Sequence, residues 1–199
     1  MFGIENAVFD STFSDKTSLF AQIEKERPDV LAIYANLMTK INVLYIAKKC
    51  KEVSPDTKVV MGGPDVTYNL KNYLDNGASK IAILDVDFHH GNGTQDIFYN
   101  RDDVLFVSIH GDPLETFPFH LGHASETGEG KGEGYNLNMP LPPNTPFDVW
   151  RAAMAKGLER IAEYKPDILI ISLGVDTFET DPISFFKLMS DDFTTMGAD

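Results

Sequence analysis

Two carboxylates and an imidazole follow one apolar run near the middle of the chain. Asp85, Asp87 and His89 are spaced two residues apart, directly after the run Lys80-Ile-Ala-Ile-Leu. Residues at this spacing face the same side of an extended strand, so we expect the three side chains to point together. Carboxylate oxygens and imidazole nitrogens are suitable zinc ligands, and a catalytic zinc needs three protein donors and an open position. The segment therefore predicts a divalent metal site.

Asp176 is the simplest third donor. It comes shortly after a second buried-strand pattern, Asp167–Ser172. If the two strands are neighbours in a parallel sheet, their carboxyl ends meet at the edge where α/β proteins bind ligands. Asp87, His89 and Asp176 would then form a site of two carboxylates and one imidazole. The alternative is that these acids only cap helices or turns.

Short apolar runs alternate with amphipathic segments along the chain. The expected strands are Asn6–Phe9, Asp29–Tyr34, Thr57–Met61, Lys80–Asp85, Val104–Ile109 and Asp167–Ser172. The expected helices are Lys16–Arg27, Ile41–Val53, Tyr68–Asn76 and Phe147–Tyr164. Such alternation is typical of βαβ units around a parallel sheet that is buried on both faces. We predict an α/β protein, a three-layer α/β/α sandwich with a mostly parallel sheet of about six strands, in a single domain spanning residues 1–199.

One long segment interrupts this alternation. Gly111–Thr145 is rich in Gly and Pro and has no clear periodicity. Loops of this length inside a compact domain are usually functional, so we expect a site wall or lid. The alternative is disorder, although Phe117, Phe119 and Leu121 would be unusual in a solvated linker.

Three motifs surround the candidate ligands. They are Asp85-Val-Asp-Phe-His-His-Gly-Asn-Gly-Thr-Gln95, Val107-Ser-Ile-His-Gly-Asp-Pro113, and Ser172-Leu-Gly-Val-Asp-Thr-Phe178 with Asp181-Pro182. Residues from about 80 to 199 thereby resemble the histone deacetylase and acetylpolyamine amidohydrolase family, and the acetylpolyamine amidohydrolases most closely. The resemblance implies an arginase/deacetylase-like core, with residues 79–199 forming a deacetylase-like metal-site half.

The resemblance also implies which ions this half holds. Zinc, or ferrous iron in its place, would be bound by Asp87, His89 and Asp176. A structural potassium ion would lie near Asp85. Its further ligands would be Ser108 and the carbonyl oxygens of Asp87, His89 and Ile109.

The reaction implied by the resemblance is hydrolysis of an acetylated amine, either an acetylpolyamine or an acetyl-lysine peptide. Zinc polarises the amide carbonyl and lowers the pKa of its bound water. A histidine takes the proton from that water, and a tyrosine hydroxyl stabilises the oxyanion. The region of Phe119 and Gly122 would form the wall of the substrate tunnel.

Both catalytic auxiliaries are expected to be missing. The family's base comes from a pair of adjacent histidines upstream of the first metal ligand, and no histidine precedes His89 here. The family's tyrosine lies in a Gly-Gly-Tyr segment downstream of the match, and the sequence through Asp199 contains none. Asp85 and Asn92, which orient the histidine pair in relatives, would lack their partners. We therefore expect impaired activity.

The other histidines and Tyr135 offer no clear replacement. His90 neighbours a ligand, so on an extended backbone it should point away from the metal. We expect His110 to be a satisfied residue near the core, and His120 and His123 to lie on the long loop. Tyr135 is a conceivable substitute for the missing tyrosine.

Residues 1–78 resemble a different family more weakly. Val8-Phe-Asp-Ser-Thr12, Lys25–Tyr34 and Val59-Val-Met-Gly-Gly-Pro-Asp65 are similar to the cobalamin-binding lobe of radical S-adenosylmethionine enzymes. This likeness implies a flavodoxin-like half in which Gly62 and Gly63 approach a nucleotide tail, the alternative being a tight turn. Cobalamin itself is not expected, because no Asp-x-His-x-x-Gly motif supplies a cobalt ligand. A non-catalytic corrinoid- or nucleotide-binding module is the alternative function.

The two resemblances together make the chain look like a splice of two families. The join near Ala78–Lys80 falls between a helix and a strand, where one βα unit can replace another. This hypothesis predicts that the Lys80 strand lies beside an N-terminal strand in one continuous sheet.

Composition limits the partners and the compartment. The chain has 199 residues, is 43% apolar and carries a formal charge of −13. This charge argues against nucleic acid and favours a small cationic substrate, although acidity can serve solubility alone. Cys50 is the single cysteine, and no apolar run is long enough to span a membrane, so we expect a cytoplasmic protein, with homo-oligomerisation left open.

Overall fold

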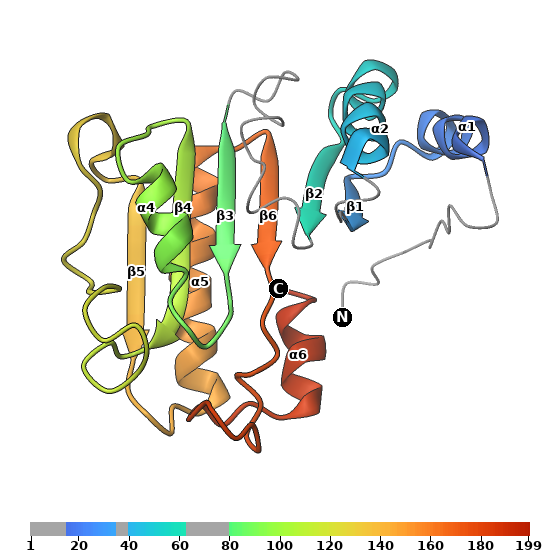
Figure 1. Cartoon of the computed structure of the whole chain (residues 1–199). Coiled ribbons are helices and arrows are strands. Elements are labelled where there is room, and N and C mark those ends of the chain that lie inside the picture. Colours follow the sequence, from blue (N-terminus) through green and yellow to red (C-terminus); the bar gives the residue numbers. More distant parts are fainter. Residues whose placement is uncertain (1–14, 35–39, 63–79) are drawn as a thin grey trace.

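The fold is described from a computed structural model. It describes residues 15–34, 40–62 and 80–199 (Figure 1). The strands are β1 Val30–Tyr34, β2 Lys58–Gly62, β3 Ile81–Asp85, β4 Val104–Gly111, β5 Asn136–Leu141 and β6 Ile168–Ser172. The helices are α1 Lys16–Glu26, α2 Lys40–Val53, α4 Asn92–Phe98, α5 Phe147–Tyr164 and α6 Ser190–Met196, with a 3-10 turn at Gly130–Gly132.

All six strands join one parallel sheet in the order β1-β2-β6-β3-β4-β5. Strand β3 lies between β4 and β6, and its last residue, Asp85, is in register with Ser108 and Ser172 on these neighbours. The carboxyl ends of the three central strands therefore meet at one edge, which is the lower edge in Figure 1.

Helices cover both faces of this sheet, so the predicted three-layer architecture is confirmed. Ile81 and Ile83 pack with α1, α2 and Phe98 of α4, whereas Ala82 and Leu84 pack against α5 on the opposite face. This division follows from the two-residue periodicity of a strand. The first cluster contains residues from both β2 and β3, so the N-terminal strands and the later strands share one core.

One detail of the topology differs from the prediction. The Lys80 strand does not lie beside an N-terminal strand, because β6 is inserted between β3 and β2. The crossover through α5 carries the chain from the edge strand β5 past β4 and β3, which puts β6 in the middle of the sheet. The single continuous sheet is as expected; the expected strand 6–9 and helix 68–76 lie outside the described residues.

The long segment 111–145 contains a strand that the sequence did not predict. In β5, Asn136 and Asn138 point into the protein while Leu137 and Met139 pack toward α5. Asparagine and proline are depleted in strands, which hid the alternation. Pro140 is tolerated because β5 is at the edge of the described sheet.

The shared core predicts that the two halves unfold together. Replacing Ile170, which is fully buried in β6, by alanine should lower the free energy of unfolding by about 2–5 kcal/mol through a lost transfer term and a cavity. Ile97→Ala is the control, because this side chain is 54% exposed and its loss should cost below about 1 kcal/mol. Urea denaturation followed by circular dichroism should show one transition for each variant; two separate transitions would refute the single-domain prediction.

Candidate metal centre

The first two candidate ligands lie in a bend beyond β3. The strand ends at Asp85, so the extended geometry assumed for all three residues is wrong for Asp87 and His89. The bend nevertheless brings these two together. The His89 amide donates a hydrogen bond of 2.7 Å to Asp87 Oδ1, and His89 Nδ1 lies 3.4 Å from the same oxygen.

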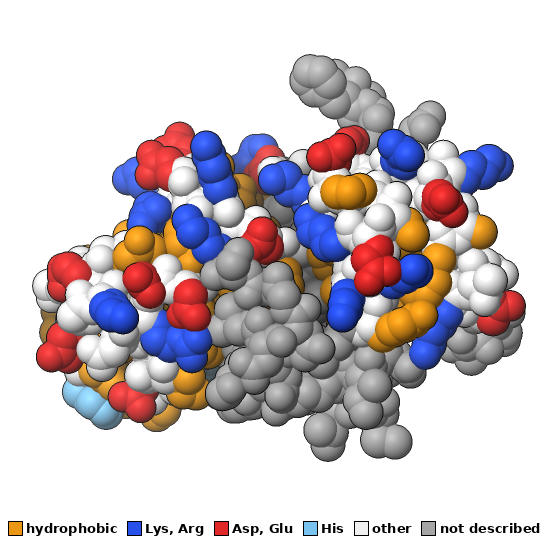
Figure 2. Space-filling model, turned by 90° about the horizontal axis from the view of Figure 1, so that it is seen from above, with side chains coloured by type: hydrophobic (Ala, Val, Ile, Leu, Met, Phe, Trp, Pro, Cys, Tyr) orange, Lys and Arg blue, Asp and Glu red, His pale blue; other side chains and the backbone are white. Residues whose placement is uncertain are grey.

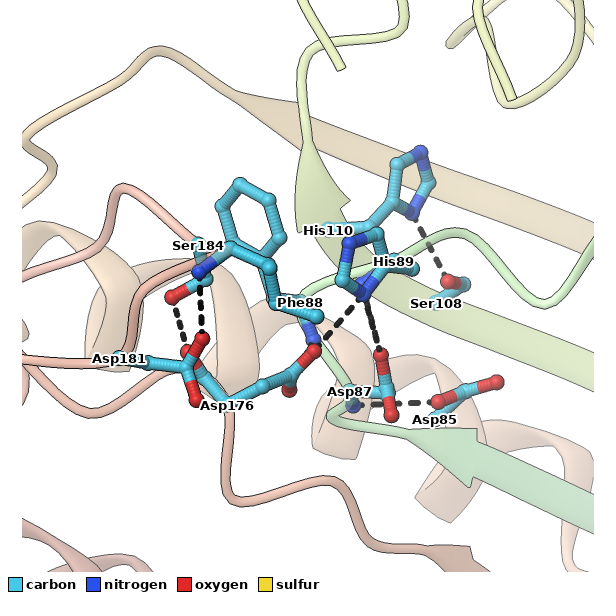
Figure 3. A network of polar contacts seen from close by, with 10 residues as sticks. Asp85, Asp87, Phe88, His89, Ser108, His110, Asp176, Asp181 and Ser184 are labelled. Atoms are coloured by element: carbon cyan, nitrogen blue, oxygen red, sulfur yellow. Dashed lines mark hydrogen bonds and ion pairs between the residues drawn. The ribbon is translucent and has the colours of Figure 1, made fainter. Parts of the chain in front are cut away.

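Asp176 reaches the same point from the loop after β6. Its Oδ2 lies 2.7 Å from His89 Nδ1, and its Oδ1 accepts a 3.0 Å hydrogen bond from the Phe88 amide. The Ser184 hydroxyl donates to the Asp176 carbonyl and fixes the backbone there. Figure 3 shows the three side chains converging from two separate loops. The structure therefore brings together the residues that the sequence singled out.

The arrangement fits a divalent metal. One ligand atom from each of Asp87, His89 and Asp176 lies within 4.8 Å of the others, a spacing that a small ion with short metal–ligand bonds can bridge. No Lys or Arg in the described part of the chain forms an ion pair with either carboxylate. Burial raises the pKa of Asp87, and the adjacent Asp176 charge raises it further. A cation would remove this repulsion, and the Asp87 side chain is 37% exposed, so the site is open to solvent.

Gly174 fits closely beneath this centre, and sequence reasoning did not identify it. A Cβ at this position would overlap the Asp87 carboxylate and lie 2.8 Å from Asp176 Oδ1. The backbone of the β6 loop can therefore reach the two carboxylates only because residue 174 has no side chain. The motif Leu173-Gly-Val-Asp176 contained the signal, but only three-dimensional contacts give it this meaning.

Asp85, the expected potassium ligand, is buried at the end of β3. It is 3% exposed, lies between Ser108 and Ser172, and accepts a hydrogen bond from the Asp87 amide. Burial raises the pKa of Asp85 to about 7. Ser108 donates its proton to His110 Nδ1, so the lone pairs on Ser108 Oγ stay available. Binding of potassium by Asp85, Ser108 and Ile109 stays a prediction.

The two buried histidines hydrogen-bond to groups other than Asp87, His89 and Asp176. His110 Nδ1 lies 2.8 Å from Ser108 Oγ, and His110 Nε2 lies 2.9 Å from the Gly122 carbonyl, so His110 is satisfied as expected. His90 Nε2 bonds Gln95, and burial lowers the pKa of His90. Burial also lowers the pKa of His110, to about 4. Both rings are therefore neutral at pH 7, and His90 Nδ1 is the one nitrogen of these two rings without a hydrogen-bond partner.

The aromatic ring beside His89 is Phe117. Its centroid lies 6.4 Å from that of His89, and the side chain is 56% exposed. Phe119, the predicted wall residue, is 62% exposed and has a positive φ of 65°. Gly122 instead anchors the end of this loop through His110. The ring contact with a candidate ligand therefore comes from Phe117, and a wall role for Phe119 and Gly122 stays a prediction.

Three other candidates lie elsewhere. Asn92 begins α4 and borders a surface hollow with Gln95 and Glu126, and its amide bonds the His90 carbonyl. Tyr135 directly precedes β5 and packs on Tyr164, at the amino ends of the strands. The candidate ligands lie at the carboxyl ends, so Tyr135 is no substitute for a catalytic tyrosine. Gly62 ends β2 beside β6. Gly63 lies outside the described residues.

The histone deacetylase domain matches residues 65–199, more than half of the chain. The chain belongs to the histone deacetylase family. The match begins at residue 65, somewhat before the stretch from about residue 80 that carried the resemblance. No helix among the described residues is both long and apolar enough to cross a membrane.

Two individual relatives show a more specific similarity within this family. The chain is 62% identical over 124 residues to an acetylpolyamine amidohydrolase of Mycoplana ramosa and 61% identical over 125 residues to acetylpolyamine amidohydrolase 1 of Pseudomonas aeruginosa. These matches cover 62% and 63% of this chain and 36% of each relative. The chain therefore spans about a third of the length of these relatives.

Solved structures extend the likeness over more of the chain. The acetylpolyamine aminohydrolase of Burkholderia pseudomallei superimposes with a TM-score of 0.67 and 29% identity, over 91% of this chain and 49% of its own. An HDAC homologue complexed with SAHA gives a TM-score of 0.66 and 28% identity, over 78% of this chain and 48% of its own. The arginase/deacetylase-like fold is thereby confirmed.

The contact at Gly174 yields a prediction about metal affinity. Gly174→Ala should weaken zinc binding roughly 10–100-fold, as is typical when the surroundings of a ligand are disturbed, because the added methyl displaces the Asp87 carboxylate. Gly93→Ala is the control, since a Cβ there meets nothing within 4 Å. Isothermal titration with zinc would measure both affinities. Equal affinities for the two variants would contradict the proposed crowding.

The buried His110 predicts a pH dependence of stability. The unfolded chain gains a proton on this residue below about pH 6.5, whereas the folded protein resists protonation down to about pH 4. Stability from this group is therefore lost as the pH falls from 6.5 toward 4, by at most about 3 kcal/mol.

The pH dependence of stability should be compared between the parent and variants. The raised pKa of Asp85 increases stability as the pH falls, and it does so equally in all of them. From pH 7 to 4.5, the parent should lose about 2 kcal/mol more stability than His110→Gln, which cannot titrate. His120→Gln, at an exposed position, should behave like the parent. Urea unfolding at several pH values tests this; parallel profiles for the parent and His110→Gln would rule it out.

Proposed function

We propose that this chain carries a zinc-dependent, deacetylase-type amidohydrolase site that acts on acetylated amines. The observation that supports this most directly is the convergence of Asp87, His89 and Asp176 at the carboxyl edge of a deacetylase-family sheet. The names of the two relatives, acetylpolyamine amidohydrolases, favour an acetylpolyamine over an acetyl-lysine peptide. Ferrous iron suits the same donors.

Different residues of the chain would bind the metal ion and the substrate. A divalent metal, when bound, polarises an amide carbonyl and activates a water molecule. Asp87, His89 and Asp176 would hold it, and the Phe88 and His89 amides keep the two carboxylates in orientation. Phe117 offers an apolar surface beside the ligands for the aliphatic part of a substrate.

The charge distribution supports a cationic substrate. Three segments begin at or just after the carboxyl ends of β3, β4 and β6, namely 85–96, 111–126 and 173–199. Together they contain 12 of the 30 acidic residues and one of the 17 basic residues. They carry 11 of the 13 net negative charges. The view onto the opposite edge shows Lys and Arg side chains mixed with acidic ones (Figure 2). Such an asymmetric field steers an acetylated amine with a free ammonium group toward the metal edge.

Turnover by the chain is expected to be slow. Proton transfer by a positioned base contributes roughly 10²–10⁴-fold to rate. Both ring nitrogens of His110 are hydrogen-bonded, to Ser108 and to Gly122, and His90 Nε2 bonds Gln95 while its Nδ1 has no partner but is closed off from solvent, so we expect neither to take this role.

The corrinoid- or nucleotide-binding alternative rests on the likeness of residues 1–78 to a cobalamin-binding lobe and gains no support from the named relatives. The division of the chain near residue 78, a cytoplasmic location, a homo-oligomer and a bound potassium ion likewise stay predictions. A retained corrinoid spectrum after incubation with cobalamin would revive the alternative.

The proposal predicts that metal content and activity depend on the same residues. The purified chain should bind about one zinc ion, as three converging donors imply, and Asp176→Ala should lose most of it. Hydrolysis of an acetylated diamine should be detectable, slow and abolished in that variant. Metal analysis by mass spectrometry and release of acetate give the two readouts. Asp181→Ala is a control, because this residue also follows β6 but is absent from the ligand set.

Salt provides the test of substrate charge. The kcat/KM for the cationic substrate should decrease as the ionic strength is raised, because salt screens the attraction. The kcat/KM for a neutral acetamide of equal length should change little. Zinc binding without any hydrolysis would leave a metal-binding protein and would contradict the enzymatic part of the proposal.

A further inference from the structure

We propose that His110 is a positioning residue that holds the loop bearing Phe117 in place beside the metal ligands. It would do so by hydrogen bonding to the backbone of Gly122, at the far end of that loop. The link to substrate binding rests on the proposed deacetylase-type function, whereas the hold on the loop does not.

The hydrogen bonds of His110 have a definite direction. A carbonyl oxygen only accepts hydrogen bonds, so His110 Nε2, 2.9 Å from the Gly122 carbonyl, must carry the proton. A neutral imidazole carries one ring proton, so Nδ1 is the acceptor and receives the Ser108 hydroxyl at 2.8 Å. The ring is fully buried, and each nitrogen has one partner. This tautomer links strand β4 to the loop in a single orientation.

Gly122 is shaped to receive this hydrogen bond. Its φ of +105° is a conformation that side chains disfavour, and a Cβ there would lie 2.8 Å from His110 Nε2 and 2.9 Å from His90 Cγ. Its amide donates a 2.9 Å hydrogen bond to Glu126 Oε2. Glu126 in turn accepts from the Gln95 side chain on α4. Both polar backbone atoms of Gly122 are therefore tied to elements packed on the sheet.

The segment between these anchors presents the aromatic ring. At the near end, the Gly111 amide bonds the Phe88 carbonyl, and the Thr116 amide bonds the Asp112 carbonyl. Phe117 follows directly and lies 6.4 Å from His89, ring centroid to ring centroid. Beyond Phe117, the side chains of Phe119 and His120 are exposed, and the chain is buried again at Gly122. Loss of the far anchor should therefore free Phe117 without moving Asp87, His89 or Asp176.

The loop itself can be tested without any ligand. Amide hydrogen exchange measured by mass spectrometry should be faster across residues 117–123 in His110→Leu than in the parent, and unchanged in α5, because only the anchor is lost. His110→Gln should restore part of the protection, since its side-chain amide can still donate to the Gly122 carbonyl. His120→Gln, on the same loop but exposed, is the matched control. Unchanged exchange in His110→Leu would overturn the proposal.

Binding of two hydroxamates to the zinc-loaded protein tests the consequence for substrate. Octanohydroxamate carries an aliphatic chain and acetohydroxamate does not. The Kd of octanohydroxamate should rise roughly tenfold in His110→Leu, the effect of losing one aromatic contact, while that of acetohydroxamate stays within about twofold. Gly122→Ala is a second variant that keeps all donors and acceptors, and it should show the same selective loss.

The outcomes separate this inference from the proposed function. Equal weakening of both hydroxamates would mean that His110 supports the metal centre as a whole, which overturns a specific role in the wall. If the zinc-loaded parent binds neither hydroxamate, the deacetylase-type function fails, and the exchange measurement still decides whether His110 holds the loop.

Discussion

The candidate site depends on the pairing of β3 with β6. These strands run parallel in a register that sets Asp85 opposite Ser172, so the chain leaves both strands at the same level of the same edge. From there, two residues of bend bring Asp87 and four residues of loop bring Asp176 to the same imidazole. A shift of one residue in this register would turn the side chains of β6 to the other face of the sheet and displace the loop that carries Asp176. The register is fixed by buried residues on both faces, such as Ile83 and Leu84, so the core specifies where the three candidate ligands converge.

Like charges at this edge explain several of the closest contacts. Two carboxylates beside one imidazole repel each other, and each is held by a backbone amide donor. The loop after β6 approaches them so closely that residue 174 must be glycine. The two backbone amides balance only part of the negative charge of the two carboxylates, which favours binding of a metal ion. The acidic loops around these carboxylates extend the negative field toward solvent.

Sequence periodicity predicted the scaffold well because the central strands are buried on both faces. Continuous apolar runs such as Ile168–Ser172 have few other interpretations, and β1, β2, β3, β4 and β6 all lie where such runs occur. Strand β5 was missed because its inward residues, Asn136 and Asn138, are polar; both side-chain amides donate to Gln95 Oε1 instead of packing in an apolar core. The order of the strands was not predictable in detail, since periodicity carries no information about which strands are adjacent.

The candidate ligands were predictable for a different reason: donor types at fixed spacing restrict the chemistry even when the backbone geometry is misjudged. Asp87 and His89 converge although the strand ends before them. The ring contact with His89 comes from Phe117 and not from the expected Phe119. The loop is held by hydrogen bonds of Gly111 with Phe88 and of Gly122 with His110. Such contacts between residues distant in sequence leave no periodic signal.

The N-terminal strands show how differently scaffold and site constrain a sequence. The family match begins at residue 65, yet the likeness to a solved aminohydrolase covers 91% of the chain. Strands such as β1 and β2 need only apolar residues that fit between helices and neighbouring strands, and many sequences meet that condition. The carboxyl edge needs two acids, one imidazole and glycines at specified points, and few sequences do. A weak likeness to other parallel sheets in the first half is therefore what a shared scaffold produces, and it carries no separate function by itself.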